Sequence, residues 1–240
     1  MLTYTQLKKN PRQFCALTGL MPKEFESLLL GFGRAYERRY PPDKTRTGQR
    51  RKRQVGGGRK SSLTSLEHKL LFVLVYQKTY PLQVVLGELF ALSQPRANEW
   101  IHRLLPVLQE ALDALGVLPE RDPQQFAQQQ RRQAEPPEFI IDGTERRRQR
   151  PKDPEKQVLH YSGKKKTHSD KNVVIVNAQS RRVSYLSQTY AGRTHDKKIA
   201  DSEPIAYPCQ ATLHKDTGFQ GYEPCVHQTY QPKKSLAGVN

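Results

Sequence analysis

The 240-residue chain contains few cysteines and no long apolar run. Its three cysteines, Cys15, Cys209 and Cys225, are too few and too scattered for a disulfide framework or for paired zinc-ligand spacing. A membrane span would need about 18 to 20 consecutive apolar residues, which the chain lacks, and Met1 to Leu20 lack the compact apolar core of a signal peptide. These absences favour a reducing, cytoplasmic setting and argue against a membrane as the partner.

Acidic residues are also much less frequent than basic ones. The chain has 23 Asp and Glu against 40 Lys and Arg, which gives a formal net charge of +17. A basic surface of this size concentrates polyanions through long-range attraction and counterion release. Nucleic acid is therefore the expected partner. The hydrophobic content of 35% is low but sufficient for buried cores, and the length predicts two domains.

The first half of the chain shows helical periodicity. Residues 1–39 are predicted to form a small helical segment, in which Pro22 occupies the first turn of a helix. Residues 40–62 are polar and basic, with glycine and proline, and are predicted to form a linker that settles on phosphates. Residues 63–118 carry three apolar stripes at helical spacing and are predicted to form a DNA-binding domain of three short helices.

The joint between the second and third of these helices is short. Ser93 is suited to cap the third helix, and Pro95 to occupy its first turn, only a few residues after the second stripe. This arrangement is helix-turn-helix geometry. Pro106 removes a backbone donor, so the third helix is expected to kink or end near Leu105.

The second half of the chain changes to strand patterns. Residues 119–137 form a polar connector, and residues 138–240 are predicted to form an α/β domain, so that the chain is α+β overall with an all-α region first. Within this pattern, three strands in sequence, a helix and another strand describe a mixed sheet with a meander followed by a crossover. The predicted strands are 139–142, 158–161, 172–178, 182–189, 211–216 and 226–230, and the helix is 195–202.

Two aspartates, Asp142 and Asp216, stand at the ends of predicted strands. In a crossover sheet the first and fourth strands can be neighbours, which would bring the two carboxylates to one sheet edge. Paired carboxylates can hold Mg²⁺, which assists phosphoryl transfer. The alternative is that each aspartate is a turn residue, since each is followed closely by glycine. On spacing alone the turn interpretation is the stronger one.

Several clusters could contact DNA. The runs Arg146, Arg147, Arg148 and Lys164, Lys165, Lys166 flank Asp142 in the sequence and suit phosphate positioning, although a solvated charge run would look the same. On the third helix, Arg96, Asn98, His102 and Arg103 lie opposite the apolar stripe and are suited to a major groove, although any surface helix shows polar residues there. His195 and Asp196 either support a metal site or cap the helix that begins there.

The residues that carry these features resemble a known family. They are Ile141 to Glu145 with Arg150 and Pro151, Tyr161 to Lys166 with His168, Gly192 to Asp196, and Asp216 to Gly221. In this order, after a helix-turn-helix, they resemble an IS5-type insertion-sequence transposase of the DDE group, whose catalytic domain is RNase H-like.

The resemblance implies a role and a partner for each region. Asp142 and Asp216 would be two acids of the catalytic triad, holding Mg²⁺ or Mn²⁺. The partner would be double-stranded DNA, first the terminal inverted repeats of the element and then target DNA. Synapsis of two ends would require a homo-oligomer, and the setting would be the bacterial nucleoid. Water would cut the element's end, and the freed 3′-hydroxyl would attack the target.

One part of the family pattern is expected to be missing. The third acid of the family is a glutamate on a helix after the fifth strand, whereas Ser235 to Asn240 look unrelated to that region. Glu223 precedes the last predicted strand and is a poor substitute. We therefore expect a truncated catalytic domain, with a change of reading frame near Lys233 and Lys234. A fragment of this kind could instead be a non-enzymatic binder that represses transposition by occupying the element's ends.

Overall fold

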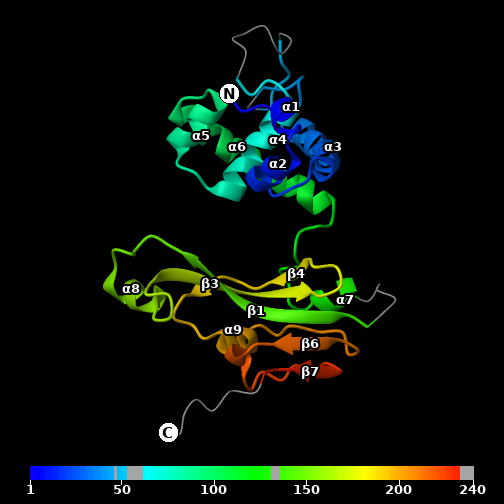
Figure 1. Cartoon of the computed structure of the whole chain (residues 1–240), viewed down its shortest axis with the longest axis vertical. Helices are drawn as coiled ribbons and strands as arrows, with labels where there is room; N and C mark the ends of the chain where they lie inside the picture. Colours follow the sequence, from blue (N-terminus) through cyan, green and yellow to red (C-terminus); the bar gives the residue numbers. More distant parts are fainter. Residues whose placement is uncertain (46–47, 53–61, 131–135, 233–240) are drawn as a thin grey trace. The chain divides into compact units, whose positions relative to one another are not determined.

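The chain forms two compact units, Met1–Val117 and Leu118–Asn240, in a computed structural model (Figure 1). The structure describes residues 1–45, 48–52, 62–130 and 136–232, except for the side chains of residues 129 and 130. Part of the predicted basic linker, residues 46–47 and 53–61, and the predicted frame change near Lys233 lie outside the described residues. Each unit has its own hydrophobic core.

The first unit is helical and has a single core. Buried phenylalanines from the N-terminal helices, Phe14, Phe25 and Phe32, lie in the same cluster as Phe72 and Phe90 from the later ones. The segment 1–39 therefore packs with the helices that follow it. The helices are α1 (Tyr4–Leu7), α2 (Pro11–Thr18), α3 (Pro22–Arg39), α4 (Leu66–Thr79), α5 (Gln83–Phe90) and α6 (Gln94–Ala114).

The predicted helix-turn-helix is formed by α5 and α6, with only Ala91 to Ser93 between them. The joint is tight because the Leu92 amide donates to the Gly87 carbonyl at 2.9 Å. A Cβ at Gly87 would lie 2.5 Å from the Leu92 carbonyl oxygen, so this position requires glycine. The short joint expected from the sequence is confirmed.

Of the two outcomes expected near Leu105, a kink or an end, the end is wrong, because α6 continues through Pro106 to Ala114. The residues after the proline supply buried side chains, Val107, Leu108 and Ala111, to the helical core. Their burial compensates for the one backbone hydrogen bond that proline cannot make. Tertiary packing thus overrides the local preference.

The second unit contains a seven-stranded mixed sheet, which confirms the predicted fold class. Its main path runs β2-β3-β1-β6-β7, and β4 and β5 both pair with β3. β1 is antiparallel to β3 and parallel to β6, and β6 is parallel to β7. The strands are β1 (Glu138–Arg147), β2 (Tyr161–Ser162), β3 (Thr167–Asn177), β4 (Val183–Leu186), β5 (Tyr190–Ala191), β6 (Thr212–Lys215) and β7 (Gln228–Tyr230).

Short helices accompany this sheet: α7 (Phe126–Gln130), α8 (Pro154–His160), α9 (Asp196–Ser202) and a 3-10 turn, η1 (Thr217–Phe219). Ile199 and Ala200 of α9 are buried in one cluster with Phe139 and Ile141 of β1 and with residues of β3 and β6. Figure 1 shows α9 beside β1 and β6. α9 therefore covers the face of the sheet that carries Ile141.

The strand predicted at 158–161 is wrong, because most of it belongs to α8. The Asp153 side chain accepts a hydrogen bond from the Lys156 amide at 3.0 Å, and Pro154 occupies the first turn. These are helix-start signals, and they outweigh the short apolar run Val158-Leu159. Both apolar side chains are exposed.

In the part of the chain that the structure describes, no helix is both long enough and apolar enough to cross a membrane.

Candidate metal centre and DNA-binding surface

Asp142 and Asp216 occupy matching positions on neighbouring parallel strands. The register of β1 against β6 pairs Ile141 with Lys215. Asp142 is the next residue of β1, and Asp216 is the first residue after the end of β6. Their backbones are therefore separated by about one strand spacing, roughly 5 Å. The expectation that the strands leading to Asp142 and Asp216 are neighbours is confirmed. Both aspartates are exposed, whereas Ile141 and Lys215 are buried.

Each aspartate also makes a local hydrogen bond. Asp142 Oδ1 accepts from the Gly143 amide at 2.7 Å, and Asp216 Oδ1 accepts from the Gly218 amide at 2.9 Å, which caps η1. These contacts are those of the turn interpretation. They fix the carboxylates, but each Oδ2 has no hydrogen-bond partner among the described residues. Capping and metal binding are compatible here.

A third carboxylate, that of Asp196 at the start of α9, lies behind this pair. A Cβ at Gly143 would lie 2.5 Å from Asp196 Oδ1, and a Cβ at Gly218 would lie 3.3 Å from Asp196 Oδ2 and 3.0 Å from Asp216 Oδ1. Asp196 therefore packs against the two glycines that follow the candidate ligands. Side chains alternate along a strand, so Asp142 points to the face opposite α9.

Lys171 connects Asp196 to β1. Its ammonium lies 3.1 Å from Asp196 Oδ1 and 3.2 Å from Glu145 Oε1, and it donates to the Thr194 carbonyl at 3.0 Å. Both members of the Lys171–Glu145 pair are only 10% exposed. The contact with Asp196 is a charge contact without hydrogen-bond geometry, so Asp196 Oδ1 remains a buried oxygen with no hydrogen bond.

Glu145 is held ionised in this network. Burial raises the pKa of its carboxyl, but hydrogen bonds from Ser162 and Lys171 and the Lys171 charge lower it, and the pKa falls below its ordinary value. The Ser169 hydroxyl also donates to Glu145, at 3.2 Å. The Lys171 ammonium thus holds two carboxylates, those of Glu145 and Asp196, behind Asp142.

These carboxylates fit a divalent cation in part. Asp142 and Asp216 offer two oxygen donors at one edge, and Mg²⁺ is commonly held by one or two carboxylates together with substrate phosphates. In the described ranges, however, no three histidine, cysteine or acidic side chains converge on a common point. Glu223, already a poor substitute in the sequence, pairs with Lys215 at 2.9 Å.

The basic clusters beside Asp142 differ in how they are engaged. Arg146 donates to Asn172 at 2.8 Å, and Arg148 pairs with Asp170 at 2.8 Å. The Arg147 guanidinium has no such partner within the described part of the chain. Lys164, Lys165 and Lys166 are all exposed in the turn between β2 and β3. Arg147 and the lysines are thus the freest to meet phosphates.

The candidate contacts on α6 differ in the same way. Arg96 and His102 are exposed, and Arg96 pairs only with its neighbour Glu99. Asn98 accepts a hydrogen bond from Gln83 of α5 at 3.2 Å. The Arg103 guanidinium lies over three aromatic rings, those of Tyr40 at 4.2 Å, Trp100 at 5.0 Å and Tyr36 at 5.8 Å. Asn98 and Arg103 therefore already have intramolecular roles.

The arrangement on α9 separates His195 from Asp196. His195 is the N-terminal flanking residue of α9, is exposed, and makes no side-chain cap. Asp196 instead points into the packed region described above. Only Asp196 of this pair lies against the glycines beside the candidate metal ligands.

Comparison with protein families agrees with this division of the chain. Residues 141–238 match the family described as DDE superfamily endonuclease, and residues 61–114 match the helix-turn-helix of DDE superfamily endonuclease. The chain is therefore similar to both regions of these enzymes, in the expected order. Comparisons with curated proteins and with solved structures gave no match.

Sequence reasoning missed the role of Lys171 and Glu145. The signal was present as an unusual polar stretch, Ser169 to Asn172, at the start of an otherwise apolar strand. Polar residues inside a sheet must find partners, so such a stretch indicates a network. Which partners they find depends on α9, and that could not be read from spacing.

Proposed function

We propose that this chain is a transposase of the IS5 type, which binds the ends of an insertion sequence and catalyses metal-dependent DNA cleavage and strand transfer. The observation that carries the proposal is the placement of Asp142 and Asp216 at matching positions of two parallel strands. It is supported by the two family matches and by the net charge of +17.

In this proposal Asp142 and Asp216 hold Mg²⁺ or Mn²⁺. Such a cation, when bound, activates the attacking water or 3′-hydroxyl and stabilises the leaving oxygen. The protein's own residues hold and orient the reactants. Asp196 and Lys171 fix the backbone of Gly143 from behind, and Arg147 and the Lys164–Lys166 turn neutralise phosphates on either side. α6 presents Arg96 and His102 to the duplex.

The partners in this proposal are the terminal inverted repeats and target DNA, and joining two ends would require at least two copies of the chain. The setting would be the cytoplasm of a bacterium, where the DNA is accessible. Both assignments follow from the proposed reaction.

The alternative is a non-enzymatic DNA-binding protein that occupies the element's ends and represses transposition. One observation favours it: the described residues include no group of three or more histidine, cysteine or acidic side chains that could hold a metal ion. A chain of this kind would keep the helix-turn-helix and the basic surface, and would bind DNA without cutting it.

Incubation of the purified chain with supercoiled plasmid carrying candidate terminal repeats separates the two. The transposase proposal predicts nicking that requires Mg²⁺ or Mn²⁺, stops with a chelator, and is lost in Asp142→Asn. Asp201→Asn is a matched control, since Asp201 is an exposed acid paired with Lys197 on α9. Binding without nicking at any metal concentration would support the repressor instead.

A further inference from the structure

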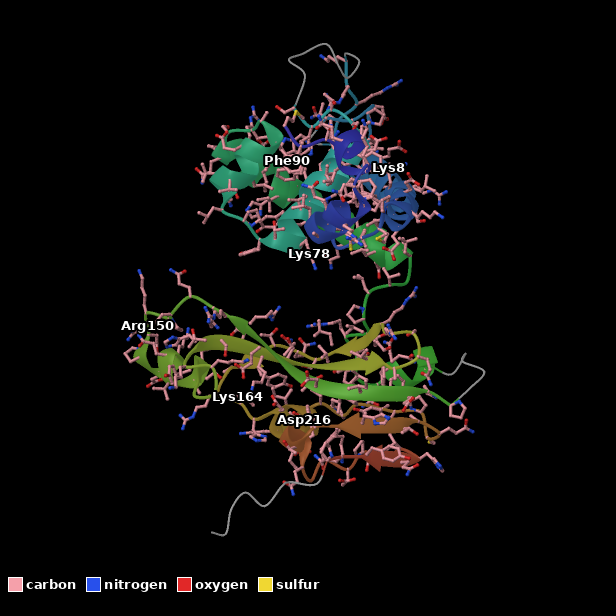
Figure 2. The ribbon with its side chains drawn as sticks, in the orientation of Figure 1. Lys8, Lys78, Phe90, Arg150, Lys164 and Asp216 are labelled. Atoms are coloured by element: carbon pink, nitrogen blue, oxygen red, sulfur yellow. The ribbon has the colours of Figure 1, made fainter. Side chains whose placement is uncertain are left out.

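A cavity of about 670 Å³ opens beside α8, away from Asp142 and Asp216. Its walls come from α8, from the β2–β3 hairpin and from the loop before α9. In Figure 2, Arg150 and Lys164 lie near α8, whereas Asp216 lies beside α9. Its lining includes Arg150, Gln157, Val158, Tyr161, His168 and Arg193.

The cavity combines an apolar wall with a basic rim. Val158 and Tyr161 remain 56% and 45% exposed, although both are apolar enough to be buried elsewhere. The Tyr161 and His168 rings form an edge-to-face pair, with centroids 5.6 Å apart and planes at 70°. In either orientation of such a pair, at least one face of the Tyr161 ring is clear of His168 and available for stacking.

Two guanidinium groups stand at the rim. Arg150 is oriented by two hydrogen bonds to Gln157 Oε1, at 3.0 and 2.8 Å. Arg193 has no side-chain partner in the described part of the chain. A free guanidinium beside an oriented one is suited to the phosphates on either side of a nucleotide.

The walls are fixed by backbone contacts. The Arg193 amide donates to the Leu159 carbonyl of α8 at 3.2 Å, and the Gly192 amide donates to the Ser169 carbonyl of β3 at 3.0 Å. A Cβ at Gly192 would lie 2.2 Å from Ser169 Oγ, so only glycine allows this approach. The segment that carries Arg193 is therefore held against α8 and β3 by backbone contacts.

We propose that this cavity receives one unpaired nucleotide of the DNA substrate, with its base on Tyr161 and its phosphates on Arg150 and Arg193. The volume suits a nucleotide and is far larger than a phosphate requires. Aromatic stacking with a basic rim is the usual way to hold single-stranded DNA. The inference rests on the proposed function, because it makes DNA the ligand.

The position of the cavity agrees with a DNA strand that passes Asp142 and Asp216. β1 continues from Asp142 to Arg147, which at roughly 3.3 Å per residue is about 17 Å, or about five base-pair steps of duplex DNA. Arg150 follows shortly after. A DNA end placed at Asp142 would thus have its flanking nucleotides within reach of Tyr161.

The test is binding of the full chain to two hairpin DNAs in the presence of a chelator, measured by fluorescence anisotropy. One hairpin is blunt, and the other carries a short single-stranded 3′ tail. The wild-type chain is expected to prefer the tailed DNA. Tyr161→Ala should lose about tenfold on the tailed DNA and less than twofold on the blunt DNA, because one stacked base is removed. Tyr161→Phe should keep the preference.

Two controls sharpen the comparison. Lys164→Ala, outside the cavity, should weaken both DNAs by the same factor. A tail with an abasic site should bind the wild-type chain as weakly as the normal tail binds Tyr161→Ala. The proposal is overturned if Tyr161→Ala weakens both DNAs equally, if the abasic tail binds normally, or if the wild-type chain shows no preference for a tail.

The two proposals fail in different ways. A chain that nicks plasmid but shows no tail preference overturns the cavity assignment alone. A chain that binds neither hairpin overturns both.

Discussion

At the scale of single residues, the candidate metal centre depends on glycine as much as on acid. Gly143 and Gly218 follow the two aspartates and leave the space into which Asp196 fits. Their hydrogen atoms allow one carboxylate to pack behind two others. The residues that hold the site together are therefore not the ones that would hold the cation.

Gly143→Ala is expected to destabilise the second unit by about 1–3 kcal/mol, because the new Cβ would lie 2.5 Å from Asp196 Oδ1 and displace it from Lys171. Urea unfolding measures the change. Gly163→Ala is the matched control, since nothing lies within 4 Å of a Cβ there. Equal stability of the two variants would mean that Asp196 is not held as described.

Glu145 predicts how stability changes with pH. Its pKa is lower in the folded chain than in the unfolded chain, so its contribution is present above its ordinary pKa, which is about 4, and is lost as the pH falls through the folded value. Wild type should exceed Glu145→Gln in thermal unfolding midpoint at pH 7, and the gap should close below about pH 4. A gap that is constant from pH 7 to pH 3 contradicts this.

The role of a single residue could be predicted from the sequence where its type and its immediate neighbours were enough to indicate its chemistry. Asp142 and Asp216 could be proposed because acids that end a predicted strand and are followed by glycine within two residues are few in this chain. The link from Lys171 to Asp196 could not, since it joins β3 to α9 through three-dimensional packing. The roles of Asn98 and Arg103 were hidden for the same reason, because their partners lie on other helices.

At the scale of elements, long periodic segments were predictable and short ones were not. The three helices of the 63–118 region and the crossover from β3 through α9 to β6 follow from apolar spacing. The helix at 158–160 could not be predicted from apolar spacing, because the short run Val-Leu-His-Tyr at 158–161 fits a strand and a helix equally well. Asp153 and Pro154 just before it decide the outcome.

Pro106→Ala is expected to stabilise the first unit by about 1–2 kcal/mol. A proline inside a helix costs about 3 kcal/mol, and part of this is offset because proline also restricts the unfolded chain. Thermal unfolding measures the gain. Pro95→Ala, in the first turn of the same helix, should have little effect, since no backbone donor is needed there. A lower thermal unfolding midpoint in Pro106→Ala than in the wild-type chain would contradict the expected cost of a proline inside α6.

At the scale of the whole molecule, charge dominates. A net charge of +17 predicts DNA binding that weakens steeply with salt, and Arg147 is expected to contribute one phosphate contact. Arg147→Ala should reduce the slope of log affinity against log salt by about 1. Arg39→Ala, whose guanidinium is paired with Glu110, should leave the slope unchanged. An unchanged slope in Arg147→Ala would remove Arg147 from the interface.

Asp142 and Asp216 are proposed to hold a divalent cation together. Titration of the chain with Mn²⁺, followed by electron paramagnetic resonance, measures this binding without DNA and without turnover. The signal of free Mn²⁺ should be depleted by the wild-type chain and by Asp201→Asn. Asp142→Asn and Asp216→Asn should each weaken binding at least tenfold, because each removes one of two charged ligands. Equal depletion by all four proteins would contradict the claim.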